Sequence, residues 1–176
     1  MPSPIGHALG GALFGGVFAG RPGPAAARGP SRGRWWRDAL VLAAVGLVPD
    51  LDFVLGAHSR DTHSVGAIVA AGVVAWLVTG RRLAWAFAVA AAYGSHVLFD
   101  WLGNDTTPPI GIMALWPFSD GFYQSNVHLF MAISRRYWLD NFWTHNLTAV
   151  AWELVLLGPP TLIIWWWRSR FCTTSR

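Results

Sequence analysis

The sequence predicts an all-α fold, a multi-pass membrane helical bundle of about five apolar helices, from its composition, charge and hydrophobic pattern. Hydrophobic residues fill 53% of the 176 positions and charged residues only 12%, with a mean hydropathy of +0.37. Such a chain is too apolar for an ordinary soluble domain, and its length predicts one membrane-embedded domain over residues 1–176. The net charge of +4 comes from arginine alone. In an apolar chain this charge is typical of topology signals, so no nucleic-acid partner is expected.

Five apolar stretches follow one another along the chain. They cover roughly residues 5–20, 39–56, 66–80, 83–102 and 147–167. Only the last two approach the ~20 residues that a transmembrane helix needs, so the shorter ones must tilt, thin the bilayer or be shielded by neighbours. The first stretch also resembles a signal-peptide core. It lacks a basic segment before it, and arginines follow it, so a retained membrane helix is the preferred interpretation.

Two connecting segments have contrasting compositions. Residues 21–37 are rich in Arg, Pro, Gly and Ala, have nothing to bury and should form a flexible loop. Residues 103–146 contain the aromatic, partly amphipathic stretch NVHLFMAISRRYWLDNFW, which carries Arg135 and Arg136. We expect residues 103–146 to form an outer, interfacial lid. A helix that rests on the membrane without a substrate role fits the pattern equally well.

The arginines also predict an orientation. If five stretches cross the membrane in alternation, three arginines lie on one side, at positions 60, 135 and 136. The other ten lie on the opposite side, at positions 21, 28, 32, 34, 37, 81, 82, 168, 170 and 176. Because cytoplasmic loops are enriched in positive charge, we expect the C-terminus to be cytoplasmic and the N-terminus to face outside.

Ionisable residues of separate apolar stretches fall at similar predicted depths. Counting about 1.5 Å per residue from the arginine-rich boundary places four of them at about 18–21 Å: His7, Asp50, His96 and Glu153. The same count places His63 and Asp100 at about 25–27 Å. The half of the spans nearer the cytoplasm has no ionisable side chain. Since a carboxylate in hydrocarbon is costly unless neutralised, we expect these residues to face one another.

Carboxylates that face imidazoles form the donor set of a divalent cation, and zinc fits this mixture of oxygen and nitrogen. On a helix, His96 and Asp100 share a face at i, i+4, and Pro49 can bend the chain so that both carboxylates of the Asp-x-Asp pair point one way. The predicted ligands are His7, Asp50, Asp52, His63, His96, Asp100 and Glu153. A buried ion-pair network that holds the helices together is the alternative. Glu153 can also simply pair with an arginine or a histidine.

The sequence also resembles a known family, in an ordered set of short motifs. These motifs are PIGHALGG, VPDLD, HSRDTHS, GSHVLFDWL and LWPFS, and they cover roughly residues 4–120. They resemble the YdjM-like family of bacterial inner-membrane, metal-dependent hydrolases. The resemblance implies metal-binding or catalytic roles for His7, Asp50, Asp52, His58, His63, His96 and Asp100. The family usually has an arginine directly after the first histidine of HSRDTHS, where this chain has Ser59 followed by Arg60.

The resemblance extends distantly to zinc-dependent phospholipases C and nucleases, which implies hydrolysis of a phosphoester of a lipid or lipid-linked substrate by metal-activated water. The short polar loop beside His63 then supplies the predicted catalytic residues: His58 or Asp61 as general acid or base, and Arg60 to bind the substrate anion. Membrane lipids are the expected partners. A non-catalytic, metal-stabilised membrane or interaction protein is the main alternative. A transporter is disfavoured, because an ion must be solvated at every depth.

Overall fold

The computed structural model describes residues 1–19, 34–55, 59–106 and 108–171, which form helices and irregular connections without a β-strand. In chain order the elements are α1 (Pro4–Phe18), α2 (Arg34–Val45), the 3-10 helices η3 (Val48–Leu55) and η4 (Asp61–His63), α3 (Val65–Val78), α4 (Leu83–Trp101) and α5 (Phe142–Phe171). The all-α prediction is therefore confirmed over the described ranges.

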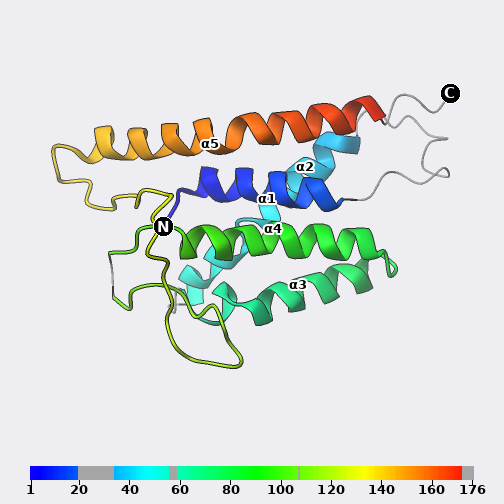
Figure 1. The fold of residues 1–176 in the computed structure, drawn as a ribbon, viewed down its shortest axis with the longest axis horizontal. Coiled ribbons are helices and arrows are strands. Elements are labelled where there is room, and N and C mark those ends of the chain that lie inside the picture. Colours follow the sequence, from blue (N-terminus) through cyan, green and yellow to red (C-terminus); the bar gives the residue numbers. More distant parts are fainter. Residues whose placement is uncertain (20–33, 56–58, 107, 172–176) are drawn as a thin grey trace.

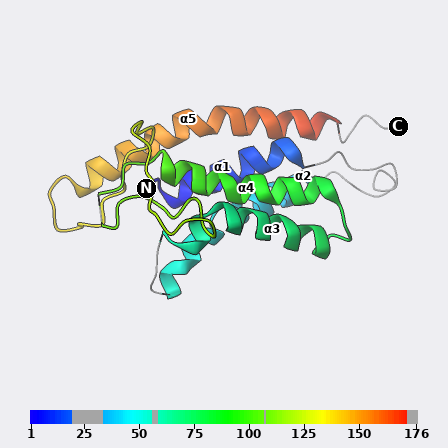
Figure 2. The same cartoon turned by 60° about the horizontal axis from the view of Figure 1, so that its bottom comes forward.

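The helices lie side by side along one long axis (Figures 1 and 2). Helices α1, α3 and α5 start at the end of the molecule where the N-terminus lies, and α2 and α4 run back towards that end (Figure 1). We call this end the site end, and the opposite end the arginine end. The arginine end carries the start of α2, the turn between α3 and α4, and the last turns of α5.

Two of the helices are long and apolar enough to cross a membrane. They are α4, over Leu83–Trp101, and α5, over Phe142–Arg170. Helices α1 and α3 are apolar but have only 15 and 14 residues. The five-crossing bundle therefore remains a prediction, in which the shorter helices depend on tilt or on their neighbours.

Three predicted boundaries shift. The apolar stretch 39–56 is not one helix, because α2 ends at Val45 and η3 begins at Val48, just before Pro49. Residues 34–37, predicted to be part of the flexible loop, form the first turn of α2, since no Gly or Pro interrupts the chain after residue 33. The rest of that loop lies outside the described residues. Similarly, residues 142–146 of the predicted lid segment are the first turn of α5.

Helix α1 crosses α2 at two glycines that allow backbone contact. A Cβ on Gly11 would lie 2.4 Å from the Leu42 carbonyl oxygen, and one on Gly46 would lie 2.5 Å from the His7 carbonyl oxygen. Only glycine permits this approach. The crossing therefore holds His7 against the chain just before η3.

Helix α5 binds both ends of α1. At the site end, the buried Glu153 carboxylate accepts hydrogen bonds from the Ser3 backbone N–H, at 2.7 Å, and from the Ser3 hydroxyl. At the arginine end, the Arg168 guanidinium donates to the carbonyls of Gly16, at 3.1 Å, and Ala19. An acid at the start of a helix and a base at its end both complement the helix dipole. Two charges on α5 thus fix the axial position of α1.

The α4–α5 connection, residues 102–141, is irregular and folds over the site end (Figure 1). Gly103 pairs with Phe130 in an isolated parallel bridge, and Ile112 pairs with Tyr123 in an antiparallel one. Phe130 is 1% exposed, and its ring lies 4.7 Å from that of Phe99 on α4. The connection is therefore packed on the bundle at the site end, and its role as a lid stays a prediction.

Candidate metal centre

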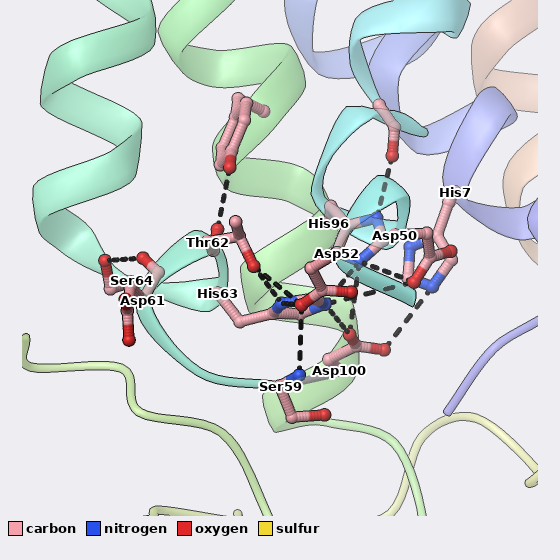
Figure 3. Close-up of polar contacts among 12 residues, drawn as sticks. His7, Asp50, Asp52, Ser59, Asp61, Thr62, His63, Ser64, His96 and Asp100 are labelled. Carbon is pink, nitrogen blue, oxygen red and sulfur yellow. Dashed lines mark hydrogen bonds and ion pairs between the residues drawn. The ribbon is translucent and has the colours of Figure 1, made fainter. Parts of the chain in front are cut away.

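Histidines and aspartates from four elements meet at the site end (Figure 3). His7 comes from the second turn of α1, His63 ends η4, and Asp50 lies in η3. His96 and Asp100 come from the last turns of α4 and share a face, with 3.2 Å between Nε2 and Oδ2. All of these residues except Asp50 are at most 1% exposed, while the Asp50 side chain is 28% exposed. The sequence prediction that these five residues face one another agrees with this geometry.

Four side-chain atoms in this cluster converge in a way that fits one cation. His63 Nε2 and His96 Nε2 lie 3.1 Å apart, and they lie 3.3 and 3.2 Å from Asp100 Oδ2. Asp50 Oδ1 lies 3.9 Å from His63 Nε2 and 3.6 Å from His96 Nε2. Ligand atoms of a tetrahedral zinc site lie about 3.3–3.6 Å apart, given bonds of about 2.0–2.2 Å. Asp50, His63 and His96 are thus able to hold a metal ion, with Asp100 close enough to complete the site.

A second candidate group lies next to the first and consists of His7, His96 and Asp100. His7 Nε2 lies 3.4 Å from Asp100 Oδ1, and its ring stacks on that of His96 with 3.7 Å between centroids. Asp100 therefore directs one oxygen towards His7 and the other towards His63 and His96. Both candidate groups contain His96, whose Nε2 can bind only one ion. If each group held an ion, the two ions would therefore have to be joined through the Asp100 carboxylate.

Buried atoms without hydrogen-bond partners support the assignment of a cation to this cluster. Both carboxylate oxygens of Asp100, and Nδ1 of His7, are buried and lack a hydrogen-bond partner among the described residues. Imidazole nitrogens lie 3.2–3.4 Å from the Asp100 oxygens without hydrogen-bond geometry, and a buried carboxylate that lacks hydrogen bonds is costly. A divalent cation among these residues would satisfy Asp100, so the donor set fits a metal.

The imidazoles are oriented by neighbours outside the two groups. His96 Nδ1 lies 2.8 Å from the Gly46 carbonyl oxygen and therefore donates to it, which directs Nε2 towards the centre. His63 Nδ1 lies 3.2 Å from Asp52 Oδ2. Partners of this kind fix the ring and increase its basicity as a ligand.

Asp52 takes a different part from the one the sequence predicted. Its Oδ2 accepts hydrogen bonds from the Thr62 hydroxyl, at 2.7 Å, and from the Ser59 backbone N–H, at 3.2 Å. This oxygen faces the outer nitrogen of His63 rather than the centre. Asp50 and Asp52 are two residues apart in the 3-10 helix η3, which has three residues per turn, so their side chains point in different directions and Asp52 acts as the orienting partner of His63.

Glu153, also predicted as a ligand, lies outside both candidate groups. Its two oxygens bind Ser3 at the start of α1. The depth count placed Glu153 at the correct level but could not give its direction around the α5 axis. Its position agrees better with the alternative that it pairs within the bundle, although its partner is an N-cap serine rather than a base.

The three predicted catalytic residues have different positions. His58 lies outside the described residues. Arg60 is exposed and lines the cavity described below. Asp61 is exposed, does not line that cavity, and lies beside Ser64 on the far side of His63 from the cluster (Figure 3). The structure therefore brings Arg60, but not Asp61, to the approach of the centre.

The charge of His63 follows from its neighbours. Burial alone would lower the pKa of His63, but the carboxylates of Asp100 and Asp52 outweigh burial and raise that pKa to about 9. In the absence of a cation, a protonated His63 compensates the two acids. A cation that binds His63 must displace this proton, so binding should release protons at neutral pH.

The cluster opens into a large cavity of about 1370 Å³ between the helices and the α4–α5 connection. His7 and Asp50 line this cavity from the helical side. Arg60 lines it from the loop before η4, and Arg135 and Arg136 line it from the α4–α5 connection. A ligand in the cavity therefore reaches the candidate metal centre, with cationic side chains beside it.

The sequence analysis missed the groups that orient the histidines. Two of them, Thr62 and Ser59, bind Asp52 and lie in the HSRDTHS motif, so their position next to the predicted ligand His63 could have indicated this role. The Gly46 carbonyl gave no such signal, because a backbone acceptor carries no residue type and its partner is 50 positions away.

Comparison with protein families decides the assignment. A family model described as YdjM inner membrane protein matches residues 1–171. The chain belongs to the YdjM inner membrane protein family. The match confirms the resemblance seen in the motifs and extends it through α5. Comparisons with curated proteins and with solved structures give no significant match. Together with the two long apolar helices, family membership indicates an inner-membrane protein.

Proposed function

We propose that this YdjM family protein is a membrane-bound metal-dependent hydrolase that cleaves a phosphoester of a lipid or lipid-linked substrate. One observation carries the proposal: four ligand-type atoms from η3, η4 and α4 converge beside a cavity of about 1370 Å³, with 3.1–3.9 Å in the pairs that include His63 or His96. A purely structural metal site is normally closed, whereas a catalytic one remains open to a substrate. Asp50, with its half-buried side chain, and His7 connect the cluster to the cavity.

The residues of the metal centre have two roles: some would bind the cation, and others orient those ligands. Asp50, His63 and His96, with Asp100 beside them, would hold a divalent cation, for which zinc is the best candidate given the imidazole and carboxylate donors. Three protein ligands would leave the fourth position of the cation open to a substrate. Asp52 and the Gly46 carbonyl fix the imidazoles of His63 and His96. When bound, the cation supplies Lewis-acid polarisation and the activation of water.

His7 stands between the cluster and the cavity. Its Nε2 is held near Asp100 Oδ1, and its ring is stacked on His96, so its orientation is restricted. Arg60, at the cavity wall, provides a positive charge for the substrate anion. No role is assigned to Asp61, since it does not line the cavity.

Transport fits the distribution of polar groups less well. The described parts of α1, α3 and α4 carry no Asp, Glu, His, Lys or Arg between the cluster and the arginine end. A metal ion would find no carboxylate or imidazole ligand from these helices along that part of its path. The remaining alternative function is that of a non-catalytic protein stabilised by the metal. This alternative predicts metal binding without substrate turnover.

The test separates metal binding from turnover. Protein purified in detergent would be loaded with zinc, analysed for bound metal, and assayed against phospholipids and lipid-linked phosphates in micelles, with Asp100→Ala as the blank. We expect stoichiometric zinc and turnover above the blank. Zinc without turnover of any substrate favours the non-catalytic reading, and absence of bound metal overturns both.

We also propose that the site end faces away from the cytoplasm. The described arginines of the arginine end lie at positions 34, 37, 81, 82, 168 and 170, on the side that positively charged loops favour. A reporter fused after Arg176 should therefore read as cytoplasmic, and a tag beside Gly121 as external. An external C-terminus would contradict this orientation.

A further inference from the structure

The arginines at the site end share one surface. Arg60 precedes η4, whereas Arg135 and Arg136 lie in the α4–α5 connection, about 75 residues further along the chain. All three line the cavity that opens onto the metal centre. Positive charge from two distant segments is thus gathered at the approach to His7 and Asp50.

These arginines lack acidic partners. Among the described residues, no carboxylate lies within ion-pair distance of Arg60, Arg135 or Arg136. Two acids of the connection line the same cavity, but Asp105 Oδ2 accepts a hydrogen bond from the Gly111 backbone at 3.1 Å, and Asp120 is exposed. The guanidinium groups therefore remain available to an anion that enters the cavity.

Arg135 is held in place by an aromatic ring of the metal-binding segment. Its guanidinium carbon lies 4.7 Å from the centre of the Phe53 ring, three residues after Asp50. A guanidinium that stacks by its face keeps its edge N–H groups free for planar oxyanions such as phosphate. Phe53 also lines the cavity, so this stacking places Arg135 beside the centre.

The walls of the same cavity are partly apolar, and exposed aromatic residues lie close to its arginines in the chain. Phe122, Phe130 and Ile133 are among the lining residues. Next to the arginines, Tyr137 and Trp138 are 77% and 66% exposed, and Trp143 is 71% exposed. Exposed Trp and Tyr are typical of residues at a membrane interface. The ligand therefore combines an anionic head with an apolar part that comes from the membrane.

We propose that Arg135, positioned by Phe53, forms with Arg60 an anion-binding subsite for the phosphate head of a membrane amphiphile, whose apolar chain lies along the connection. Arg136 adds positive charge at the rim. This inference rests on the proposed function in taking the bound amphiphile to be the substrate. Binding itself requires no turnover, so the two can fail separately.

The test measures binding with a probe that cannot be hydrolysed. Octylphosphonate carries a phosphate-like head on a carbon–phosphorus bond, and methylphosphonate has the same head without the chain. Their dissociation constants would be measured by calorimetry on the zinc-loaded full chain in detergent micelles. Arg135→Gln and Arg60→Gln should each weaken octylphosphonate binding by on the order of tenfold or more, since each removes a charge-assisted hydrogen bond.

Two further variants keep the test specific. Phe53→Leu should weaken binding by a smaller factor, because it removes only the ring under Arg135. Arg81→Gln is the matched control: its guanidinium lies 5.4 Å over the Trp76 ring at the arginine end, so octylphosphonate binding should not change. Metal content and thermal unfolding should match the parent protein in all four variants.

The outcomes decide between distinct explanations. Equal losses in Arg135→Gln and Arg81→Gln, or none in either, overturn the subsite. Methylphosphonate binding as tight as octylphosphonate binding overturns the amphiphile and leaves a site for a free anion. Specific octylphosphonate binding supports the inference even if no phosphoester is hydrolysed, in which case it is the proposed function that fails.

Discussion

The two ends of the bundle handle charge in opposite ways. At the site end, His7, His63, His96 and Asp100 are at most 1% exposed and point at one another. At the arginine end, Arg81 and Arg170 lie over the rings of Trp76 and Trp166, at 5.4 and 5.2 Å. Stacked arginine and tryptophan anchor a helix at the membrane surface. Buried ionisable groups contribute no such anchoring and are costly unless a partner or cation compensates them.

This difference indicates where function lies. Charges at the arginine end fit the requirements of insertion and orientation. Charges at the site end exceed those requirements, and their ligand atoms are spaced for a cation. Changes at the site end should therefore alter metal binding and stability together, whereas changes at the arginine end should leave metal binding intact.

The largest effect should come from Asp100→Ala. Asp100 contacts all three histidines of the cluster, and its removal leaves their buried nitrogens without the shared carboxylate. Breaking a buried charge network typically costs about 3–5 kcal/mol. Bound zinc should fall to background, and the unfolding temperature should drop and no longer respond to zinc.

The control for that change is Asp120→Ala. Asp120 is an exposed acid that lines the same cavity. It should retain zinc and parental stability. Replacing Asp50, His63 or His96 with Ala should also lower bound zinc, and full occupancy in all four ligand variants would contradict the metal centre.

A second prediction concerns the glycine crossing that supports the centre. Gly46→Ala would place a Cβ 2.5 Å from the His7 carbonyl oxygen, and this clash with the backbone should separate α1 from α2. Overpacking of this kind costs about 1–3 kcal/mol. Because Gly46 also orients His96, zinc affinity should weaken, as measured by competition with a chelator.

Gly94→Ala provides the comparison, since its Cβ would make an ordinary 3.4 Å contact with the Ile68 side chain. It should keep parental zinc affinity. If Gly46→Ala and Gly94→Ala had the same zinc affinity, the close contact between Gly46 and the His7 carbonyl oxygen would not be needed for zinc binding.

A third prediction concerns Glu153. This residue joins α5 to the start of α1, as Arg168 joins α5 to the end of α1. As a cap on α1, Glu153→Gln should weaken the hydrogen bonds to Ser3 and lower the free energy of unfolding by about 1–3 kcal/mol. Zinc stoichiometry should stay full. Arg168→Gln, at the other end of α1, should act in the same direction on stability. Loss of zinc in Glu153→Gln alone would restore Glu153 as a ligand.

The sequence indicated which helix positions lie near the site end better than it indicated the direction in which their side chains point. The i, i+4 spacing brought His96 and Asp100 to one face, and the break expected near Pro49 separates α2 from η3. Counting residues placed Glu153 at the level of the cluster. It could not show that Glu153 faces Ser3, because the direction around a helix axis depends on packing with neighbours that one sequence does not specify.

Asp52 illustrates the same limit within a motif. Two carboxylates in Asp-x-Asp suggested two ligands. In the 3-10 helix the second carboxylate instead meets the outer nitrogen of His63, eleven residues later. Contacts of this kind depend on the folded loop between residues 59 and 63. The Arg135–Phe53 stack depends in the same way on how the α4–α5 connection folds back.

The smallest effect should come from Asp61→Asn. From the motif alone, Asp61 was a predicted general acid or base, and its loss would then lower turnover by ~10²–10⁴-fold. The folded η4 gives the opposite expectation, because the Asp61 side chain is exposed, does not line the cavity, and lies on the far side of His63 from the cluster. The backbone carbonyl that binds Ser64 is retained in the variant. Zinc content, unfolding temperature and turnover should therefore stay within about twofold of the parent protein, on any substrate that the Asp100→Ala blank does not cleave. A loss of 10²-fold or more with full zinc would mean that η4 turns Asp61 into the cavity when substrate binds.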